Sequence, residues 1–396
     1  MNFKNSLTPK LILATFSVAF VVFLFAIADR LYGNYLTKNT KELIYPPCSK
    51  ARHKSSEFDI TVKINSLGFR DYEYALKKKK KHRIAVIGDS FTFGWGVDME
   101  DSWVKILEKE LNEKGLDIEI LNLGKGGASP ADYAQTAKKI IPVLKPDLVV
   151  VAVLQANDLH QLIHAYDSLP VPDVEQPKRN YVAEKTNSLA NRIFANSMKI
   201  LSVKNINISE QWKRDATALL MSYKEEQKQR FDALDEKVKS DFQSGLLNPW
   251  LIHQAVYYPD YFTQPLDTSD LDVVIGTSAM ADFFANIKQE CKTNNCEMLV
   301  LSIPNLPYSS EEEMNSLKKY GFSVPDSLFG NPLADESTKM AADEAGIEFY
   351  SVSKKFRTAK KGSNLYYLFD GHFTKEGNRV FAASVKEIFE QEIKSE

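Results

Sequence analysis

The sequence is poor in cysteine and has no excess of charge of one sign. Only three of its 396 residues are cysteine, and the formal net charge is −2. This near-neutral balance gives no global indication of nucleic-acid binding, so we expect no nucleic-acid partner. No group of cysteines and histidines has the spacing of a zinc site, and we expect neither a metal nor a cofactor. The chain is long enough to bury a full core in one large domain with extensions.

The few cysteines leave their pairing open. Cys291 and Cys296 flank Lys-Thr-Asn-Asn and could form a local disulfide if the turn brings their Cα atoms within roughly 7 Å. They could equally be two unpaired thiols at the end of a helix. Cys48 follows two prolines and has no evident partner. It lies well past the apolar run near the N-terminus, which argues against a lipoprotein acylation site.

One apolar run near the N-terminus predicts the location of the protein. Residues 11–28 carry no charge, and Lys4 and Lys10 precede them. A run of about 18 or more apolar residues can span a bilayer, whereas the apolar part of a signal peptide is usually about 7–15 residues long. We therefore predict a cytoplasmic tail at residues 1–10 and an uncleaved transmembrane anchor at residues 11–28. The sequence Ala26-Ile-Ala28 keeps a cleaved signal peptide open, in which case the protein is secreted. Either way the remaining chain is extracytoplasmic.

The rest of the chain divides into an extension at residues 29–81 and a domain at residues 82–396. Strand patterns begin at positions 83, 120, 147, 298 and 347 of that domain and alternate with amphipathic helices. This alternation predicts an α/β fold with a mainly parallel central sheet. The run 148–154 contains no polar residue, as is typical of a central strand covered on both faces.

Polar residues that carry chemistry follow several of these strands. The first strand ends abruptly in Gly88-Asp89-Ser90. Ser90 is therefore expected at the carboxyl edge of the sheet, where open α/β sheets bind their ligands. A serine at that edge needs only a base and an oxyanion site to become a nucleophile. Later strand ends supply candidates for both, in the segments 122–127, 155–158 and 370–372.

Together these segments resemble the four blocks of the SGNH (GDSL-type) hydrolase superfamily, which is named for Ser, Gly, Asn and His. Gly-Asp-Ser at 88–90 matches the first block. The second block places its glycine five residues after an asparagine, and counting from Asn122 gives Gly127. A single short motif is weak evidence, but four blocks in order on the expected strand ends are strong evidence.

The third and fourth blocks match with two departures. Asn157 and Asp158 match the second half of Gly-x-Asn-Asp, but Gln155 stands where the glycine is usual. Asp370 and His372 have the Asp-x-His spacing of the alginate O-acetyltransferase-like branch, which is one residue shorter than the usual spacing.

The resemblance implies a flavodoxin-like three-layer sandwich with sheet order 2-1-3-4-5, and it implies roles. Ser90 is the nucleophile, His372 its base, and Asp370 orients the imidazole. The backbone amides of Ser90 and Gly127 and the side-chain amide of Asn157 would bind the oxyanion. Each of these residues, taken alone, could have a purely structural role in a turn or a helix cap. That all of them have only such roles is improbable. Asp89 and Asp158 are expected to bond nearby amides of their turns.

The extension contains a second strand pattern. Alternation of apolar and polar residues over 58–65 predicts a strand with one buried face, which we interpret as scaffold for the catalytic domain. The five lysines at residues 77–81 are read as a solvated linker, with contact to anionic lipid or an acidic polymer as the alternative. For Arg70 we expect a surface ion pair in preference to a contact with an anionic substrate.

A long insertion occupies residues 160–275. Its Lys/Glu/Gln-rich part, 212–243, predicts helix with a solvated face, and 248–262 is aromatic and broken by proline. This insertion could be a lid or substrate wall, or a helical subdomain that only packs against the fold. Our candidate substrate-binding residues are Tyr257 and Tyr258, together with Trp95. His160 and His164 are four residues apart, and we interpret them as helix-surface histidines in preference to metal ligands.

We therefore expect a membrane-anchored, extracytoplasmic serine esterase. It would cleave an O-acyl ester, most simply an O-acetyl ester, through a Ser90-acyl intermediate. Its partner would be a glycan of the cell envelope or a small ester. One alternative is an O-acetyltransferase of envelope polysaccharide that uses the same triad. Another is a non-catalytic binding or assembly protein that retains the fold.

Overall fold

The structure is a computed structural model, and it describes residues 47–164, 204–358 and 364–395 together with six helical positions between 15 and 24. The predicted tail at 1–10, most of the predicted anchor at 11–28 and residues 165–203 of the insertion lie outside these ranges. Among the described residues, no helix has the length and apolar character that crossing a bilayer requires. The anchor therefore stays a prediction. The described residues of 47–164, 204–358 and 364–395 belong to one compact unit, which carries the elements below.

The central sheet has five parallel strands in the order β4-β3-β5-β7-β8. The strands are β3 (His82–Gly88), β4 (Ile118–Gly124), β5 (Leu148–Leu154), β7 (Glu297–Ile303) and β8 (Glu348–Ser351). Numbered along the chain, the order is 2-1-3-4-5, which confirms the predicted flavodoxin-like topology. Every residue of β3 and β5 is buried, because helices cover both faces of the sheet.

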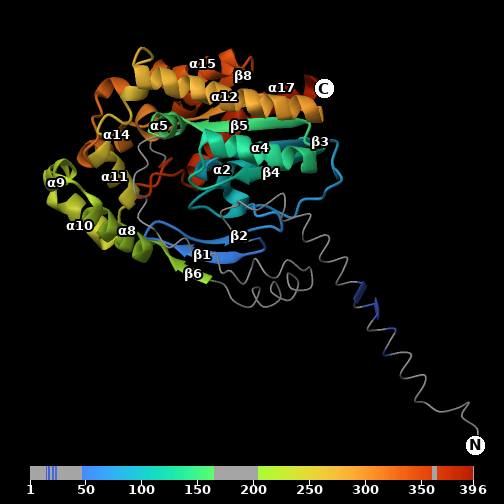
Figure 1. Cartoon of the computed structure of the whole chain (residues 1–396), viewed down its shortest axis with the longest axis horizontal. Helices are drawn as coiled ribbons and strands as arrows, with labels where there is room; N and C mark the ends of the chain where they lie inside the picture. The colour runs from blue at the N-terminus through green and yellow to red at the C-terminus, as the bar shows by residue number, and fades with distance from the viewer. Residues whose placement is uncertain are drawn as a thin grey trace, which may run out of the picture. The chain divides into compact units, whose positions relative to one another are not determined.

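Helices form the layers on either side of the sheet (Figure 1). Helices α3 and α17 pack against each other, with Trp103 and Phe381 in edge-to-face contact, and helix α12 packs against α4 and α15. The helices are α2 (Ser90–Phe93), α3 (Trp103–Glu113), α4 (Pro130–Leu144), α5 (Asn157–Ile163), α8 (Ile208–Ser222), α9 (Glu225–Asp232), α10 (Glu236–Ser244), α11 (Pro249–Tyr257), α12 (Leu271–Asn294), α13 (Leu306–Ser309), α14 (Glu311–Lys319), α15 (Glu336–Glu344), α16 (Ser353–Arg357) and α17 (Lys375–Ser395).

A second, three-stranded sheet joins the extension to the insertion. Its order is β2-β1-β6, with β1 (Lys50–Lys54) antiparallel to β2 (Asp59–Lys63) and parallel to β6 (Lys204–Asn207). The alternation of the sequence predicted β2. It did not predict β1 and β6, which are short and rich in basic and amide side chains, so they show no apolar period. Helix α8 of the insertion contacts β1 and β6, and α10 and α11 pack against α8 (Figure 1).

Arg70 of the extension is buried, and our expectation of a surface ion pair is wrong. Its guanidinium donates to the carbonyl oxygens of Phe93 (3.2 Å), Gly94 and Val97 (2.5 Å). Only 1% of the residue is exposed. Burying a charge is costly unless it is compensated, and these carbonyls accept hydrogen bonds from the Nη1 and Nη2 of Arg70. Arg70 thus holds the turn that follows α2.

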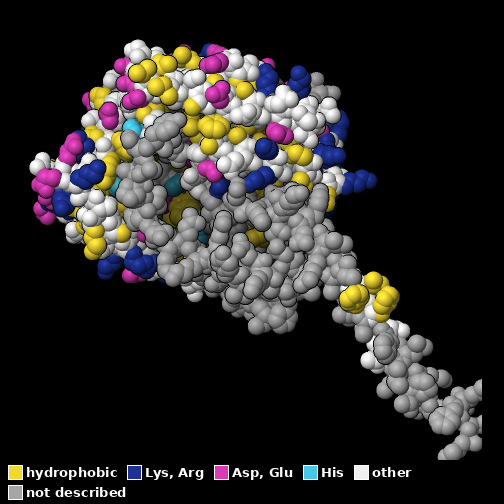
Figure 2. Space-filling view, viewed as in Figure 1, with side chains coloured by type: hydrophobic (Ala, Val, Ile, Leu, Met, Phe, Trp, Pro, Cys, Tyr) yellow, Lys and Arg dark blue, Asp and Glu magenta, His cyan; other side chains and the backbone are white. Residues whose placement is uncertain are grey.

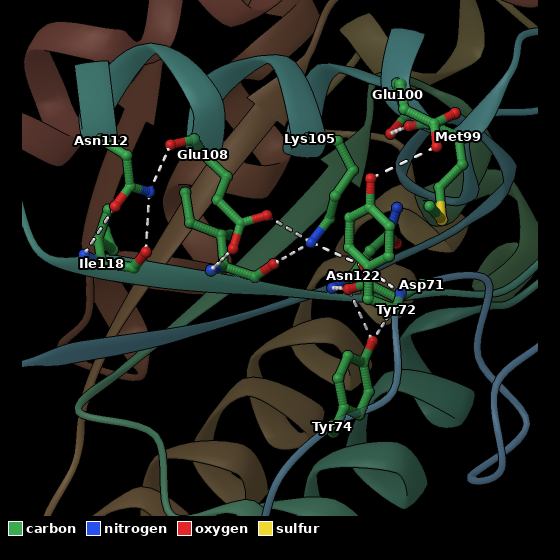
Figure 3. A network of polar contacts seen from close by, with 12 residues as sticks. Asp71, Tyr72, Tyr74, Met99, Glu100, Lys105, Glu108, Asn112, Ile118 and Asn122 are labelled. Atoms are coloured by element: carbon green, nitrogen blue, oxygen red, sulfur yellow. Dashed lines mark hydrogen bonds and ion pairs between the residues drawn. The ribbon is translucent and has the colours of Figure 1, made fainter. Parts of the chain in front are cut away.

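A buried ion pair ties the extension to the central sheet (Figure 3). Lys105 of α3 lies 2.7 Å from both Asp71 and Glu108, and it donates to the carbonyl of Ile120 (2.6 Å). The Asn122 amide donates to Asp71 Oδ2 (2.7 Å). Asp71 therefore connects the extension to α3 and to β4 at the same point.

The lysine run at 77–81 lies at the amino ends of β4 and β5. Lys78 pairs with Asp147, and Lys80 lies 2.9 Å from Asp117. On the described part of the face in view, basic and acidic side chains are interspersed (Figure 2). All three cysteines are free thiols, and Cys291 and Cys296 are buried without a disulfide between them.

Candidate active site

Ser90 is the first residue of α2 and lies just past the end of β3. Gly88, the last residue of β3, is paired in register with Gly124 of β4 and Ala152 of β5. The Asp89 carboxylate caps α2 by accepting the Phe91 amide (2.9 Å), as its predicted turn role requires. The segments that carry Gly127 and Asn157 leave the neighbouring strands at the same edge of the sheet, so the predicted residues of the first three blocks gather at this edge.

His372 joins Ser90 to Asp370. His372 Nε2 lies 2.7 Å from Ser90 Oγ, and His372 Nδ1 is hydrogen-bonded to Asp370 Oδ1. The short Asp-x-His spacing is therefore compatible with a complete Ser-His-Asp chain. Asp370 Oδ1 also accepts the backbone amide of His372 (3.2 Å). This bond keeps the carboxylate beside the imidazole despite the short spacing.

The electrostatic environment favours the imidazolium form of His372. Burial opposes a charge on the imidazole, but the adjacent Asp370 carboxylate outweighs burial, and Asp89 adds to its effect, so the pKa of His372 is raised above 6.5. Asp370 has a fully buried side chain. Its second oxygen, Oδ2, accepts the indole N–H of Trp95 at 2.9 Å. Trp95, predicted as a substrate-binding residue, thus contacts Asp370, the predicted triad acid, directly.

Gly127 lies in the turn after β4 with a backbone φ of +70°. This is the left-handed region, which glycine adopts without the steric cost that other residues incur. A Cβ placed at this position would meet no atom within 4 Å. The residue is exposed. Asn122, five residues earlier, ties the end of β4 to α2: its Nδ2 donates to the Thr92 carbonyl (2.8 Å), and its Oδ1 accepts the Gly124 amide (2.9 Å).

Asn157 follows a strained γ-turn. Ala156 has φ +62° and ψ −44°, and the Asn157 amide donates to the Gln155 carbonyl at 2.8 Å. A γ-turn of this hand is rare and unfavourable for a residue with a side chain. It puts Asn157 at the start of α5, where its Nδ2 donates to the hydroxyl of Tyr261 (2.8 Å). That bond uses one of the two Nδ2 hydrogens of Asn157 and holds the side chain in place. The second hydrogen is left for another acceptor.

Gln155, the departure from the third block, has a structural use. Its Nε2 donates to Asp335 (2.6 Å) and Ser353 (2.8 Å), and its Oε1 accepts the Asn305 amide (3.0 Å). The side chain thereby links the end of β5 to the segments after β7 and β8. A glycine at this position could make none of these bonds.

Two buried carboxylates, Asp89 and Asp158, lie beneath the site. Burial raises the pKa of Asp89 to about 6. Burial, followed by the neighbouring Asp89, raises the pKa of Asp158 well above its usual range. Asp158 Oδ2 accepts the Tyr133 hydroxyl (2.8 Å) and the Leu154 amide (3.3 Å), a turn contact in line with its predicted role.

The aromatic segment of the insertion divides into two environments. Tyr257 packs against Tyr223 and His253 inside the insertion. Tyr258 packs against His160 and His164, at ring-centroid distances of 4.6 and 4.1 Å. His160 is buried and is not a surface histidine as expected. Within the described residues, no group of three or more His, Cys, Asp or Glu side chains is placed to hold a metal ion.

Three contacts to the site were not predicted. Glu57 of the extension accepts the amides of Phe369 and Asp370, and Asn248 of the insertion bonds to the same two residues. Tyr261 bonds to Asn157. Asn248 stands before Pro249, a helix-start signal that the sequence does contain. A lone glutamate in a loop gives no such signal.

The parallel sheet and the contacts among Ser90, His372 and Asp370 are compatible with a hydrolase that cleaves ester bonds. The model of the GDSL-like Lipase/Acylhydrolase family matches residues 84–385, and the chain belongs to this family. The predicted class, a hydrolase that acts on ester bonds, agrees with this membership.

The chain is also similar to Esterase TesA of Pseudomonas aeruginosa, with 32% identity over 75 residues. That match spans 19% of this chain and 37% of the esterase. Among solved structures, a crystal structure of TesA aligns at 12% identity over 77% of this chain and 96% of that one, with a TM-score of 0.35. The acetyl xylan esterase AlAXEase aligns at 12% identity over 77% of this chain and 98% of its own, with a TM-score of 0.37.

Proposed function

We propose that the protein is a serine esterase that cleaves an O-acyl ester through a covalent Ser90-acyl intermediate. The observation that carries this proposal is the unbroken contact from Ser90 Oγ through His372 to the buried Asp370. A serine hydroxyl alone is a weak nucleophile, and a neighbouring imidazole that can take its proton activates it. The same contacts weigh against a binding protein that merely retains the fold.

The steps follow from the geometry. Ser90 Oγ attacks the ester carbonyl carbon while its proton passes to His372 Nε2. The resulting imidazolium is stabilised by Asp370. The carbonyl oxygen becomes an oxyanion, for which the amides of Ser90 and Gly127 and the Nδ2 of Asn157 are the proposed donors. Collapse of the tetrahedral intermediate releases the alcohol, which takes the proton from His372. A water molecule then cleaves the acyl-enzyme by the same route.

For the substrate we propose an O-acetyl ester on an envelope glycan or a small ester. One consideration supports this choice: the predicted anchor at 11–28 would place the site outside the cytoplasm, on the side of the membrane where envelope glycans lie. Tyr258 is proposed as a wall of the substrate site, because it packs on His160 beside Tyr261, which holds Asn157.

The test uses full-length protein in detergent with p-nitrophenyl esters from acetate to octanoate and with acetylated xylan. We expect hydrolysis of the acetate ester, release of acetate from the glycan, and a decline with longer chains. A parallel reaction contains an unacetylated glycan as acceptor. If acetyl groups were transferred to that acceptor without release of free acetate, the protein would be an O-acetyltransferase and not an esterase. No turnover of any ester with or without acceptor would refute both enzymes.

A further inference from the structure

A carboxylate of the N-terminal extension lies against the segment that carries the triad acid. The amide of Phe369 donates to Glu57 Oε1 at 3.1 Å, and the amide of Asp370 donates to Glu57 Oε2 at 2.9 Å. Both carboxylate oxygens are therefore bound to consecutive peptide groups. Such bonds to an ionised acceptor are stronger than those between neutral groups. Because the contacts are made to backbone nitrogen atoms, they fix the position of the Asp370 backbone.

The loop that presents Glu57 is itself held in place. It connects β1 to β2, and Ser55 Oγ accepts the amides of Glu57 (3.1 Å) and Phe58 (3.2 Å). The Phe58 side chain is buried between Trp95 and Tyr367, at ring-centroid distances of 6.3 and 5.5 Å. The Glu57 carboxylate thus extends from a fixed turn, so it can hold in place the backbone amides that it binds.

The opposite side of the same segment is bound by the insertion. Asn248, which caps α11, donates its backbone amide to the Phe369 carbonyl (2.9 Å) and its Nδ2 to the Asp370 carbonyl (3.2 Å). The amides of this segment are therefore bound by Glu57 and its carbonyls by Asn248. Two parts of the chain that lie outside the family's motif blocks meet on the backbone of the triad acid.

The placement of Glu57 is electrostatically unfavourable. Burial raises the pKa of Glu57, and the charge of the adjacent Asp370 raises it further, although the amides that it accepts act in the opposite direction. A partly buried carboxylate beside a second carboxylate costs stability. A residue that served only to stabilise the fold would not be favoured here.

We propose that Glu57 is a positioning residue for the triad acid. It fixes the backbone of Phe369 and Asp370 so that the Asp370 carboxylate stays aimed at His372 Nδ1. This inference rests on the proposed function, in which Asp370 and His372 work as a pair. It makes the extension part of the catalytic apparatus and not merely a spacer.

The test compares Glu57→Gln with a matched control, Asp59→Asn. Glutamine keeps the shape of Glu57, but it offers one acceptor oxygen and turns an NH₂ group toward the second backbone amide. Asp59 lies on the same hairpin, two residues further on, and its exposed carboxylate pairs with Arg52. The control therefore removes a carboxylate charge from the hairpin without touching the triad segment. Glu57→Asp, which retains the charge on a shorter side chain, is the second variant.

Full-length protein is measured in three ways: the downfield proton resonance of His372 Nδ1, assigned by its loss in Asp370→Asn; kcat and KM on p-nitrophenyl acetate; and the midpoint of urea unfolding. For Glu57→Gln we expect the resonance to broaden or move upfield and kcat to fall roughly tenfold at unchanged KM, as loss of one charge-assisted hydrogen bond implies. Glu57→Asp should recover part of both signals. Asp59→Asn should match wild type.

Glu57→Gln with wild-type resonance and kcat would overturn the proposal, even if the variant unfolded at a lower urea concentration. The proposed function fails separately, if wild type hydrolyses no ester and Ser90 takes no serine-directed label. In that case the resonance still decides whether Glu57 positions Asp370, because it is observed without turnover.

Discussion

The indole N–H of Trp95 donates to Asp370 Oδ2 at 2.9 Å. Since the other carboxylate oxygen is bound to His372, both oxygens of the triad acid are occupied. The bond to Trp95 leaves Oδ1 as the oxygen that faces the imidazole, and it stabilises the carboxylate in its buried position. Trp95 stands five residues after Ser90 of the Gly-Asp-Ser turn, and its indole reaches the carboxylate that is hydrogen-bonded to His372.

Trp95→Phe should lower kcat without weakening substrate binding. The substitution removes one hydrogen bond to a buried carboxylate, worth about 1.5–3 kcal/mol, so we expect kcat on p-nitrophenyl acetate to fall by about 10- to 100-fold with KM nearly unchanged. Trp212→Phe is the control, because Trp212 is buried in the same apolar cluster that Trp95 packs on and lies outside the triad. An equal loss in both variants would mean that cluster packing, and not the bond to Asp370, accounts for the effect.

The activity should rise with pH through a transition above 6.5. Only the neutral imidazole of His372 can take the Ser90 proton, and the pKa of His372 is raised because Asp370 favours its charged form against the effect of burial. The inactive imidazolium therefore persists to a higher pH than in an isolated histidine. The measurement is kcat/KM of wild type from pH 5 to 9. A transition below 6.5, or a profile flat across this range, would contradict the assignment of His372 as the base.

Asn157→Ala should mainly affect the transition state. Asn157 is fixed by Ala156 and by the bond to Tyr261, so its second amide hydrogen is available to the oxyanion. Loss of one such donor typically lowers kcat by about 10²–10³-fold. We expect this fall with little change in KM on p-nitrophenyl acetate, and a smaller fall in Tyr261→Phe, which loses only the support. A change confined to KM would place Asn157 in substrate binding instead.

Gln155→Gly, which restores the residue usual in the third block, should destabilise this protein. It leaves the buried Asn305 amide without its Gln155 acceptor, and it removes one of the donors to the half-buried Asp335. Unsatisfied buried groups cost about 1–3 kcal/mol each, so the free energy of unfolding should fall by at least that amount. The midpoint of urea unfolding measures it. An unchanged midpoint would show that the network around Gln155 contributes no net stability.

The sequence predicted the central sheet because its strands are long, apolar and buried on both faces, which leaves an unmistakable pattern in β3 and β5. It predicted the meeting of Ser90, Asp370 and His372 only through the order of the four blocks. The distance between Ser90 and His372 along the chain is too great for any local rule to bring them together.

What could not be predicted depends on tertiary partners. Arg70 was expected at the surface because an arginine alone gives no indication that three carbonyls will surround it. Strands β1 and β6 have no apolar alternation and exist because they pair with each other's backbone. Glu57 and Gln155 act through single contacts with distant segments, which no periodicity encodes.

The most direct test of the account is whether Ser90 becomes covalently modified and is required for turnover. Full-length wild type is treated with a fluorophosphonate, the adduct is mapped by peptide mass spectrometry, and kcat is compared with that of Ser90→Ala. The account predicts one adduct, on Ser90, its absence in the variant, and a fall in kcat of about 10⁴-fold or more. An adduct on another residue, or a Ser90→Ala protein that keeps wild-type kcat, would contradict it.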